Sequence, residues 1–425
     1  MTLTRRDLIK NGALLVAFGL TAPSFLAQSA LATQAAPLPR ALATGAGSRT
    51  RARLNGKQTL VVVQLSGGND GLNTVVPYAD PSYYALRPTL AIPREQVVAL
   101  DGNVGLHPSL APLKPFYDNG RMSVVQGVGY PNPNRSHFRS MEIWHTATPE
   151  RFEETGWLGR YLDACGCTHD RPLDAISVGD QLNRSFWTDM ALVPAIGSVG
   201  TFQFQTDPRA PNDRGNQVKA LQNIYAYAGQ FRPYEEHIRR TTLNALAGAD
   251  ELKRIATAYQ PSVAYPETPF ANSLKAVAQV MAGDLGARIF FVQLGGFDTH
   301  ANQANAHAGL LKTLADGLAA FMRDVESQGK ADDTLVMTFS EFGRRPNQNA
   351  SGGTDHGTAE PMLLLGGGIA GGVHNAAPSL SGLADGDLAY QADFRGIYAS
   401  VLQDWLGTDP APIVGQGISP LALMT

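Results

Sequence analysis

The segment that decides the fold runs from Ile289 to Phe339 and reads IFFVQLGGFDTHANQANAHAGLLKTLADGLAAFMRDVESQGKADDTLVMTF. Ile289–Leu294 and Thr334–Phe339 are short apolar runs of the kind that form buried β-strands. Between them, apolar residues recur at the spacing of one helix face, and Gly329 follows their end. These residues are Leu310, Leu311, Leu314, Leu318, Phe321 and Val325. A strand–helix–strand unit with fully apolar strands predicts a parallel sheet covered on both faces.

Similar apolar runs elsewhere in the chain extend this sheet. They are Leu60–Leu65, Met122–Gln126 and Met362–Leu365. The segment Phe394–Leu406 has the pattern of a further helix. The predicted fold class is therefore α/β, a doubly wound, mostly parallel sheet with helices on both faces. The stretch at about 150–266 mixes turn-rich polar sequence with helical pieces, and we interpret it as an inserted cap region.

The N-terminus has the pattern of an export signal. Arg5–Arg6 precedes the apolar run Gly12–Leu20, and Ala30–Ala32 has the small-x-small pattern of a cleavage site. Pro23 interrupts the apolar run, which is short of the roughly 20 residues that span a membrane. The expected segments are a twin-arginine signal peptide at 1–32, a flexible leader at 33–57 and the α/β domain at 58–425.

The signal and the composition limit the location and the partners. The signal predicts export through the twin-arginine translocase to the periplasm or the outside of the cell, with no stable membrane anchor. A net charge of −3 argues against a nucleic-acid partner. The two cysteines, Cys165 and Cys167, could form a disulfide, bind a metal with His169 or do neither, and the last is the simplest interpretation.

Polar residues cluster where the predicted strands end. Asp70 lies in SGGNDG after one strand, Asp298 and His300 lie in GGFDTH after another, and Glu341 and Arg344 lie in SEFGRR after a third. The carboxyl ends of strands in an open parallel sheet form its ligand crevice, so we expect these groups to converge. Converging carboxylates and histidines are what a divalent metal site requires. Glu341 could instead merely pair with Arg344 or Arg345.

Two more groups of polar residues lie near strands. GTDHGT contains His356 and precedes the Met362–Leu365 strand, and NRSHF contains Arg135 and Ser136 at the start of a predicted helix. A serine at a helix N-terminus is well placed for an anionic substrate or an activated nucleophile. Ser136 and Asp70 could also be simple helix caps.

A glycine pattern after the Met362–Leu365 strand resembles a dinucleotide fingerprint. Gly366, Gly368 and Gly371 satisfy G-x-G-x-x-G, but GVHNAAP, which follows, does not predict a helix. We therefore interpret the glycines as a turn. An exported oxidoreductase is a third functional hypothesis, although no flavin, haem or iron–sulfur motif is visible.

Several blocks together resemble one family of bacterial exported proteins. The blocks are LVVVQLSGGNDGLNTVVPY, RSHF, GGFDTH, SEFGRR and GTDHGTAEPMLLLGGG. From about Gln58 to Gly407 the chain is similar to the family catalogued as domain of unknown function 1501. The fold of that family is thought to resemble the alkaline phosphatase and sulfatase superfamily, which implies an alkaline phosphatase-like domain here.

The resemblance implies two metal sites and a nucleophile, Ser136. The residues that match one site are Asp298, His300 and His356, and those that match the other are Asp70 and Glu341 with Ser136 or His137. The second set is mostly oxygen, which suits Mg²⁺, Ca²⁺ or Mn²⁺ better than Zn²⁺. The sequence departs from the pattern at Glu341-Phe342, where the superfamily has Asp-His, and in the shorter spacing between Asp298 and His300.

The resulting hypothesis is an exported hydrolase that uses a divalent metal (Zn, Mg, Ca or Mn) to cleave phosphate or sulfate esters. Ser136 attacks a small anionic ester, the metal stabilises the transferred group, and Arg135, Arg344 or Arg345 holds the anion. The alternative is a catalytically degenerate exported binding protein with the same fold, which the Phe342 substitution motivates.

Overall fold

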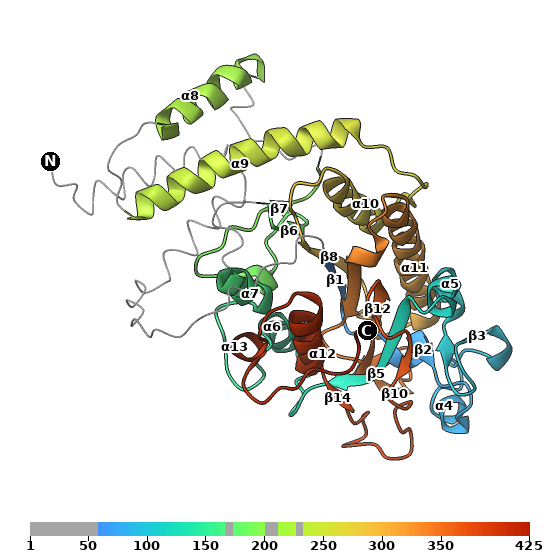
Figure 1. Cartoon of the computed structure of the whole chain (residues 1–425). Helices are drawn as coiled ribbons and strands as arrows, with labels where there is room; N and C mark the ends of the chain where they lie inside the picture. Colours follow the sequence, from blue (N-terminus) through green and yellow to red (C-terminus); the bar gives the residue numbers. More distant parts are fainter. Residues whose placement is uncertain (1–57, 166–172, 200–210, 227–232) are drawn as a thin grey trace.

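The computed structural model describes residues 58–165, 173–199, 211–226 and 233–425. Within these residues the largest element is a nine-stranded sheet of order β13-β5-β12-β9-β1-β8-β6-β7, with β14 paired to β5 (Figure 1). The strands are β1 (Thr59–Ser66), β5 (Met122–Gly129), β6 (Ala175–Val178), β7 (Ala195–Ile196), β8 (Ile289–Gly295), β9 (Thr334–Phe339), β12 (Glu360–Gly366), β13 (Gly372–His374) and β14 (Ala392–Asp393). The expected signal peptide and leader lie outside the described residues.

The predicted strand–helix–strand unit is confirmed. α11 (Gln303–Ser327) connects β8 to β9, and both strands run parallel to β1, which lies between them. The exception to parallel pairing in the middle of the sheet is β12, which runs antiparallel to both β5 and β9. The start of β12 therefore lies at the sheet edge where the parallel strands end.

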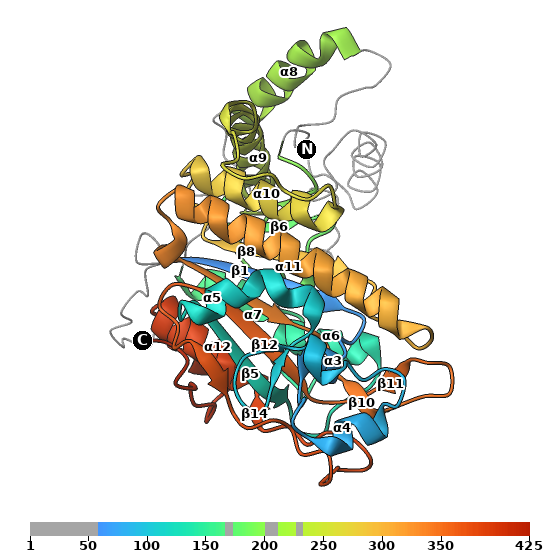
Figure 2. The ribbon, with the colours of Figure 1, turned by 90° about the vertical axis from the view of Figure 1, so that its right-hand side faces the viewer.

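Helices cover both faces of the sheet, as predicted (Figure 2). One face packs against α5 (Lys114–Asp118), α10 (Pro269–Ala282) and α11, and the other against α6 (His137–Thr146), α7 (Trp157–Cys165) and α12 (Phe394–Ser400). β1 shows the division, because Val61 and Val63 belong to the first core and Leu60 and Val62 to the second. Successive side chains of a strand point to opposite faces, so a buried central strand must be apolar throughout.

Shorter elements surround these layers. Two small sheets of the described residues are β2-β4-β3 and the ribbon β10-β11. The elements are α3 (Gly71–Thr74), β2 (Val75–Val76), α4 (Pro81–Leu86), η1 (Arg94–Gln96), β3 (Val98–Ala99), β4 (Gly105–Leu106), η2 (Pro108–Leu113), η3 (Arg184–Phe186), η4 (Pro211–Asp213), η5 (Ala331–Asp333), β10 (Arg344–Gln348), β11 (Thr354–His356), η6 (Val401–Trp405) and α13 (Ala411–Val414). The helix predicted over Phe394–Leu406 is α12 continued by the π-helical turn η6.

The segment at about 150–266 is divided between the central layers and an outlying part. α7 packs on the sheet, and β6 and β7 are two of its strands. α8 (Arg214–Ala226) and α9 (Pro233–Ala258) extend beyond the β7 side of the sheet (Figure 1). The first part of the expected insertion thus belongs to the central sheet.

Three further sequence interpretations can be compared with the structure. Gly372–His374, after the glycine-rich turn, forms a strand, as expected of a segment that is not a nucleotide-binding helix. Cys165 is disulfide-bonded, so the interpretation in which neither cysteine forms a bond is wrong, and Cys167 lies outside the described residues. Over the described part of the chain, no helix has the length and apolar character needed to cross a membrane.

Candidate metal centre

The loops that follow β1, β8 and β9 are held against one another at one edge of the sheet. The backbone N–H of Gly67 donates to Glu341 Oε1 at 2.9 Å, and that of Asn69 donates to Ser340 Oγ at 2.9 Å. A Cβ on Gly67 would lie 2.4 Å from the backbone nitrogen of Asp298, and the φ of Gly67 is +122°. Only glycine allows this backbone and this close approach. The loops therefore meet as the sequence predicted.

Two more segments reach the same edge because of the strand directions. β12 is antiparallel, so the ribbon β10–β11 that precedes it lies beside the ends of β1, β8 and β9, with Arg344 opposite His356. β5 is antiparallel to β12 and therefore ends at this edge as well. The helix α6 follows β5 and begins at His137. Asp298, His300, His356 and His137 are thereby brought together.

Asp298 lies at the centre of this group, and its side chain is 48% exposed. Its Oδ1 is 2.7 Å from Arg344 Nη2, 3.0 Å from His300 Nε2 and 3.1 Å from His356 Nε2. Its Oδ2 is 3.5 Å from His137 Nε2. Burial raises the pKa of Asp298, but hydrogen bonds from Arg344 and His356 and the positive charges nearby outweigh it and lower the pKa to about 2. Asp298 is therefore a carboxylate at neutral pH.

The three imidazoles around Asp298 are each oriented by an oxygen at Nδ1. The oxygens are Glu341 Oε1 for His137 at 2.8 Å, Asp355 Oδ1 for His300 at 3.5 Å, and the backbone oxygen of Arg135 for His356 at 2.8 Å. An oxygen acceptor at Nδ1 favours a proton on that nitrogen, and Nε2, once it has lost its own proton, then has a lone pair for a metal ion. Metal-ligating histidines are held by outer partners in this way.

The Nε2 atoms of the three rings lie close to one another and to Asp298. His300 Nε2 and His356 Nε2 are 2.9 Å apart. His137 Nε2 is buried and has no hydrogen-bond partner among the described residues. One ligand atom from each of His137, Asp298 and His356 lies within 4.8 Å of the others. Facing lone pairs repel, so this arrangement needs a proton or a cation between them, and the donors fit a metal ion.

Arg344, which was expected to hold an anionic substrate, is fully buried and points into the protein. Its donors go to the backbone oxygens of Gly67, Gly68, Phe297 and Thr354 and to Asp298 Oδ1, with His300 Nε2 at 3.4 Å. A guanidinium has five N–H donors, and these contacts use all of them. Arg344 therefore fixes Asp298 and the loops and has no donor left for a substrate.

Asp70 lies apart from this group and pairs with another residue. Its two oxygens are 2.8 and 2.6 Å from Arg87 Nη1, and neither side chain of the pair is exposed. Gln303 Nε2 also donates to Asp70 Oδ2, and the backbone N–H of Asn73 donates to Oδ1 as the cap of α3. The structure thus supports the interpretation of Asp70 as a cap and adds a buried ion pair that no sequence motif indicates.

The remaining predicted site residues surround the group. Glu341 is fully buried behind His137, with Oε1 shared between the Gly67 N–H and His137 Nδ1. Ser136 is exposed at the N-cap of α6, and its hydroxyl does not cap the helix. Arg135 Nη2 is 2.7 Å from Asp387 Oδ2. His137, which was considered for the second metal site, lies beside Asp298 and His356, the residues expected for the first.

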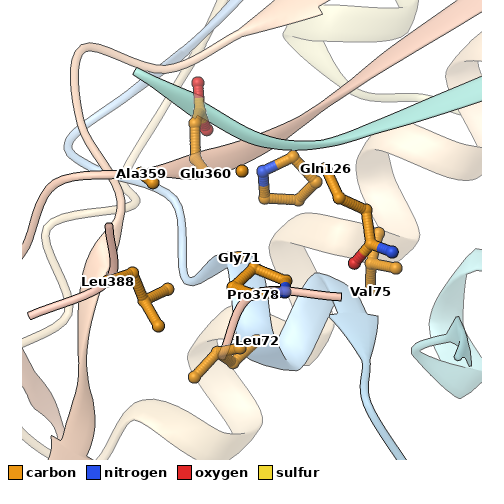
Figure 3. Close-up of a pocket in the computed structure, with 10 residues that line it drawn as sticks. Gly71, Leu72, Val75, Gln126, Ala359, Glu360, Pro378 and Leu388 are labelled. Carbon is orange, nitrogen blue, oxygen red and sulfur yellow. The ribbon is translucent and has the colours of Figure 1, made fainter. Parts of the chain in front are cut away.

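Two hollows in the described structure lie outside this group. One, of about 10 Å³, has room for at most about one water molecule and lies between α3 and β12 (Figure 3). Glu360 lines it, but its carboxyl group points away from Gly71 and Leu72 (Figure 3). The other, of about 430 Å³, is lined in part by Asp80, Asp101 and Asn375. None of the four residues of the group lines either hollow.

Comparisons with known proteins give a family match. The model of a family described as a protein of unknown function (DUF1501) matches residues 123–404. No curated protein matches the sequence.

The chain also aligns with solved structures at low identity. One is a protein in the alkaline phosphatase superfamily from Vibrio parahaemolyticus, with 11% identity, 88% of this chain and 72% of that chain covered, and a TM-score of 0.36. Another is the lipoteichoic acid synthase LtaP from Listeria monocytogenes, with 9% identity, coverage of 89% and 79%, and a TM-score of 0.37. A third is a sulfatase from Pseudoalteromonas sp., with 11% identity, coverage of 86% and 74%, and a TM-score of 0.35.

Proposed function

The chain belongs to the DUF1501 family of proteins of unknown function, and we propose that it is an exported metal-dependent hydrolase of phosphate or sulfate esters. One observation carries the proposal. Three imidazoles direct Nε2 toward the carboxylate of Asp298, two of these nitrogens are 2.9 Å apart, and each ring is held by an oxygen at Nδ1. The proposed ligands are His137, Asp298, His300 and His356.

The donor set favours a particular class of metal. Three imidazole nitrogens and one carboxylate oxygen suit Zn²⁺ or a similar transition metal better than Mg²⁺ or Ca²⁺, which prefer oxygen. When bound, such an ion supplies Lewis acidity toward an ester oxygen placed against it. The oxygen-rich second set expected from Asp70 and Glu341 does not enter this proposal, because Asp70 pairs with Arg87 and Glu341 orients His137.

The chain's own residues have separate tasks in the proposed reaction. Ser136 is the exposed residue directly before the ligand His137, at the positive end of the α6 dipole. Its Oγ forms a bond to phosphorus or sulfur while the bond to the ester oxygen breaks, and the serine proton ends on the departing alcohol. Water then cleaves the serine ester and restores the hydroxyl. Arg135, which directly precedes Ser136 and whose side chain is 37% exposed, supplies the donors for the anion.

Ser136→Ala is expected to lower turnover of a metal-loaded preparation on the order of a thousandfold or more, because the covalent step needs its oxygen. Turnover of aryl phosphate and aryl sulfate esters measures the effect, and metal content should stay unchanged because Ser136 is not a ligand. The matched control is Ser273→Ala, a half-buried helical serine on α10 that lies outside the proposed centre. If Ser136→Ala kept the turnover of the parent protein, Ser136 would not be the nucleophile.

The alternative, an exported binding protein, is favoured by one feature. Among the described residues, no side chain forms the hydrogen bond to the Ser136 hydroxyl that a general base would make, and this hydroxyl makes no capping bond in α6. A binding protein of this kind would load the metal and bind an anionic ester without cleaving it. A broad ester panel with the metal-loaded protein, followed by calorimetry with the uncleaved esters, separates the two functions.

Export is the second part of the proposal and rests on the N-terminal pattern. Changing Arg5 and Arg6 together to lysine is expected to reduce the exported fraction about tenfold or more, because the pair is read by the translocase as an address. Cell fractionation and immunoblotting measure the exported fraction. Arg40→Lys, in the expected leader, is the control and should be exported normally. Normal export of the double variant would contradict the twin-arginine route.

A further inference from the structure

The carboxylate of Asp70 is already paired with a cation, the guanidinium of Arg87. Arg87 Nη1 lies 2.8 and 2.6 Å from the two oxygens of Asp70, and both side chains are completely buried. Asp70 also accepts hydrogen bonds from Gln303 and from the backbone of Asn73. The carboxylate is therefore neutralised, and its oxygens are in use. A divalent ion placed here would meet a buried guanidinium at short range, where repulsion is strong.

Arg87 also holds the ribbon that carries a proposed ligand. Its Nε donates to the backbone oxygen of Pro346 at 2.8 Å, and its Nη2 donates to that of Arg345 at 2.9 Å. Both oxygens lie on β10, which pairs with β11, the strand that ends at His356.

Gln303 makes the second connection between the ion pair and this ribbon. It donates to Asp70 Oδ2, and its Oε1 accepts from Thr354 Oγ1 at 2.6 Å at the start of β11. The buried pair is thus linked to both strands of the ribbon.

We infer that Arg87 is the resident cation of the Asp70 carboxylate, so that the centre takes a single metal ion, and that Arg87 positions the ribbon bearing His356. The inference rests on the proposed metal centre and specifies its stoichiometry. Asp70 is then a structural anion and not a ligand. Arg87 acts on the metal through the backbone of β10 and the position of the His356 imidazole.

The stoichiometry is tested by titrating the metal-free, refolded full chain with Zn²⁺ in a calorimeter and by elemental analysis of the dialysed product. One equivalent is expected for the parent protein and for Asp70→Asn, which keeps the shape of the side chain and removes its charge. Two equivalents in the parent protein, or a lower number in folded Asp70→Asn, would overturn the inference and leave the proposed hydrolase standing. No bound metal in the parent would overturn both.

The positioning role is tested with Arg87→Lys, which keeps the charge but cannot reach Asp70, Arg345 and Pro346 together. We expect it to bind one equivalent with an affinity reduced about tenfold or more, the range found for residues that orient a ligand. Arg151→Lys, at an exposed site, is the control and should bind as the parent does. An unchanged affinity in Arg87→Lys would overturn the positioning role, and so would an equal loss in the control.

Discussion

His356→Ala is expected to abolish stoichiometric metal binding and, with it, ester hydrolysis. The substitution removes one of three imidazoles and the nitrogen that lies 2.9 Å from His300 Nε2 and 3.1 Å from Asp298 Oδ1. Loss of a residue that only orients a ligand weakens metal binding about 10- to 100-fold, so loss of a ligand should exceed about 100-fold. Elemental analysis of protein purified without chelators or a histidine tag measures the amount of bound metal directly.

Two controls make the result specific to the centre. Glu341→Gln keeps the ligands but weakens the acceptor at His137 Nδ1, so an intermediate loss of about 10- to 100-fold is expected. His374→Ala removes a histidine of β13 whose Nε2 contacts the backbone oxygen of Ala370, and it should keep the metal. If His356→Ala retained a full equivalent, the proposed ligand set would be wrong.

Asp298 is a poorer position for this test, although it lies at the centre. Its carboxylate is the acidic partner of Arg344, whose guanidinium is fully buried. Removing the carboxylate leaves that charge unpaired, which costs several kcal/mol by itself. A loss of metal in Asp298→Ala could therefore come from the missing ligand or from misfolding. Removing His356 leaves no buried guanidinium unpaired.

The main layers of the fold could be predicted because buried strands must be apolar throughout. β1, β8 and β9 lie near the middle of the sheet, and their unbroken runs are visible in the sequence. β6 and β7 could not be predicted, because Ala175–Val178 and Ala195–Ile196 are only four and two residues long. The antiparallel direction of β12 is also invisible in its sequence, since an apolar run looks the same in either direction.

The sequence allowed us to predict those site residues that lie in motifs directly after or before a strand. It did not allow us to predict which residues outside these motifs contact them. Asp298, His300 and His356 lie together in the structure, as sequence reasoning placed them at one edge. Arg344 was expected to face a substrate, but an arginine's side chain gives no sign of whether it will be buried. Arg87 belongs to no motif, and its pairing with Asp70 depends on the packing of α4, which ends just before Arg87, against β10.

Arg87→Met is expected to reduce the free energy of unfolding by about 3–5 kcal/mol, the loss typical when one partner of a buried ion pair is removed. The variant leaves Asp70 buried without its cation and removes the bonds to Arg345 and Pro346. Urea unfolding of the metal-free protein measures the change without a contribution from metal binding. Arg151→Met breaks an exposed pair with Glu153 and should cost less than about 1 kcal/mol.

The pH dependence of the stability lost in Arg87→Met tests whether the unpaired carboxylate of Asp70 causes that loss. In the parent protein burial raises the pKa of Asp70, but the charges of Arg87 and His307 and the hydrogen bonds from Arg87 and Gln303 outweigh it and lower the pKa below 3.8. The stability that this lowered pKa contributes is present above the pKa of Asp70 in the unfolded chain. It is lost as the pH falls through the pKa of Asp70 in the folded protein.

In Arg87→Met the main lowering cause is gone, so burial raises the pKa of Asp70 and its ionisation opposes folding at neutral pH. The difference in stability between parent and variant should therefore be largest near pH 7 and shrink as the pH falls through the raised pKa. Adding Asp70→Asn to Arg87→Met removes the unpaired charge and should recover about half of the loss or more at pH 7. A loss that does not change with pH, and that Asp70→Asn fails to relieve, would mean that Arg87 stabilises the fold through its backbone contacts to β10 alone.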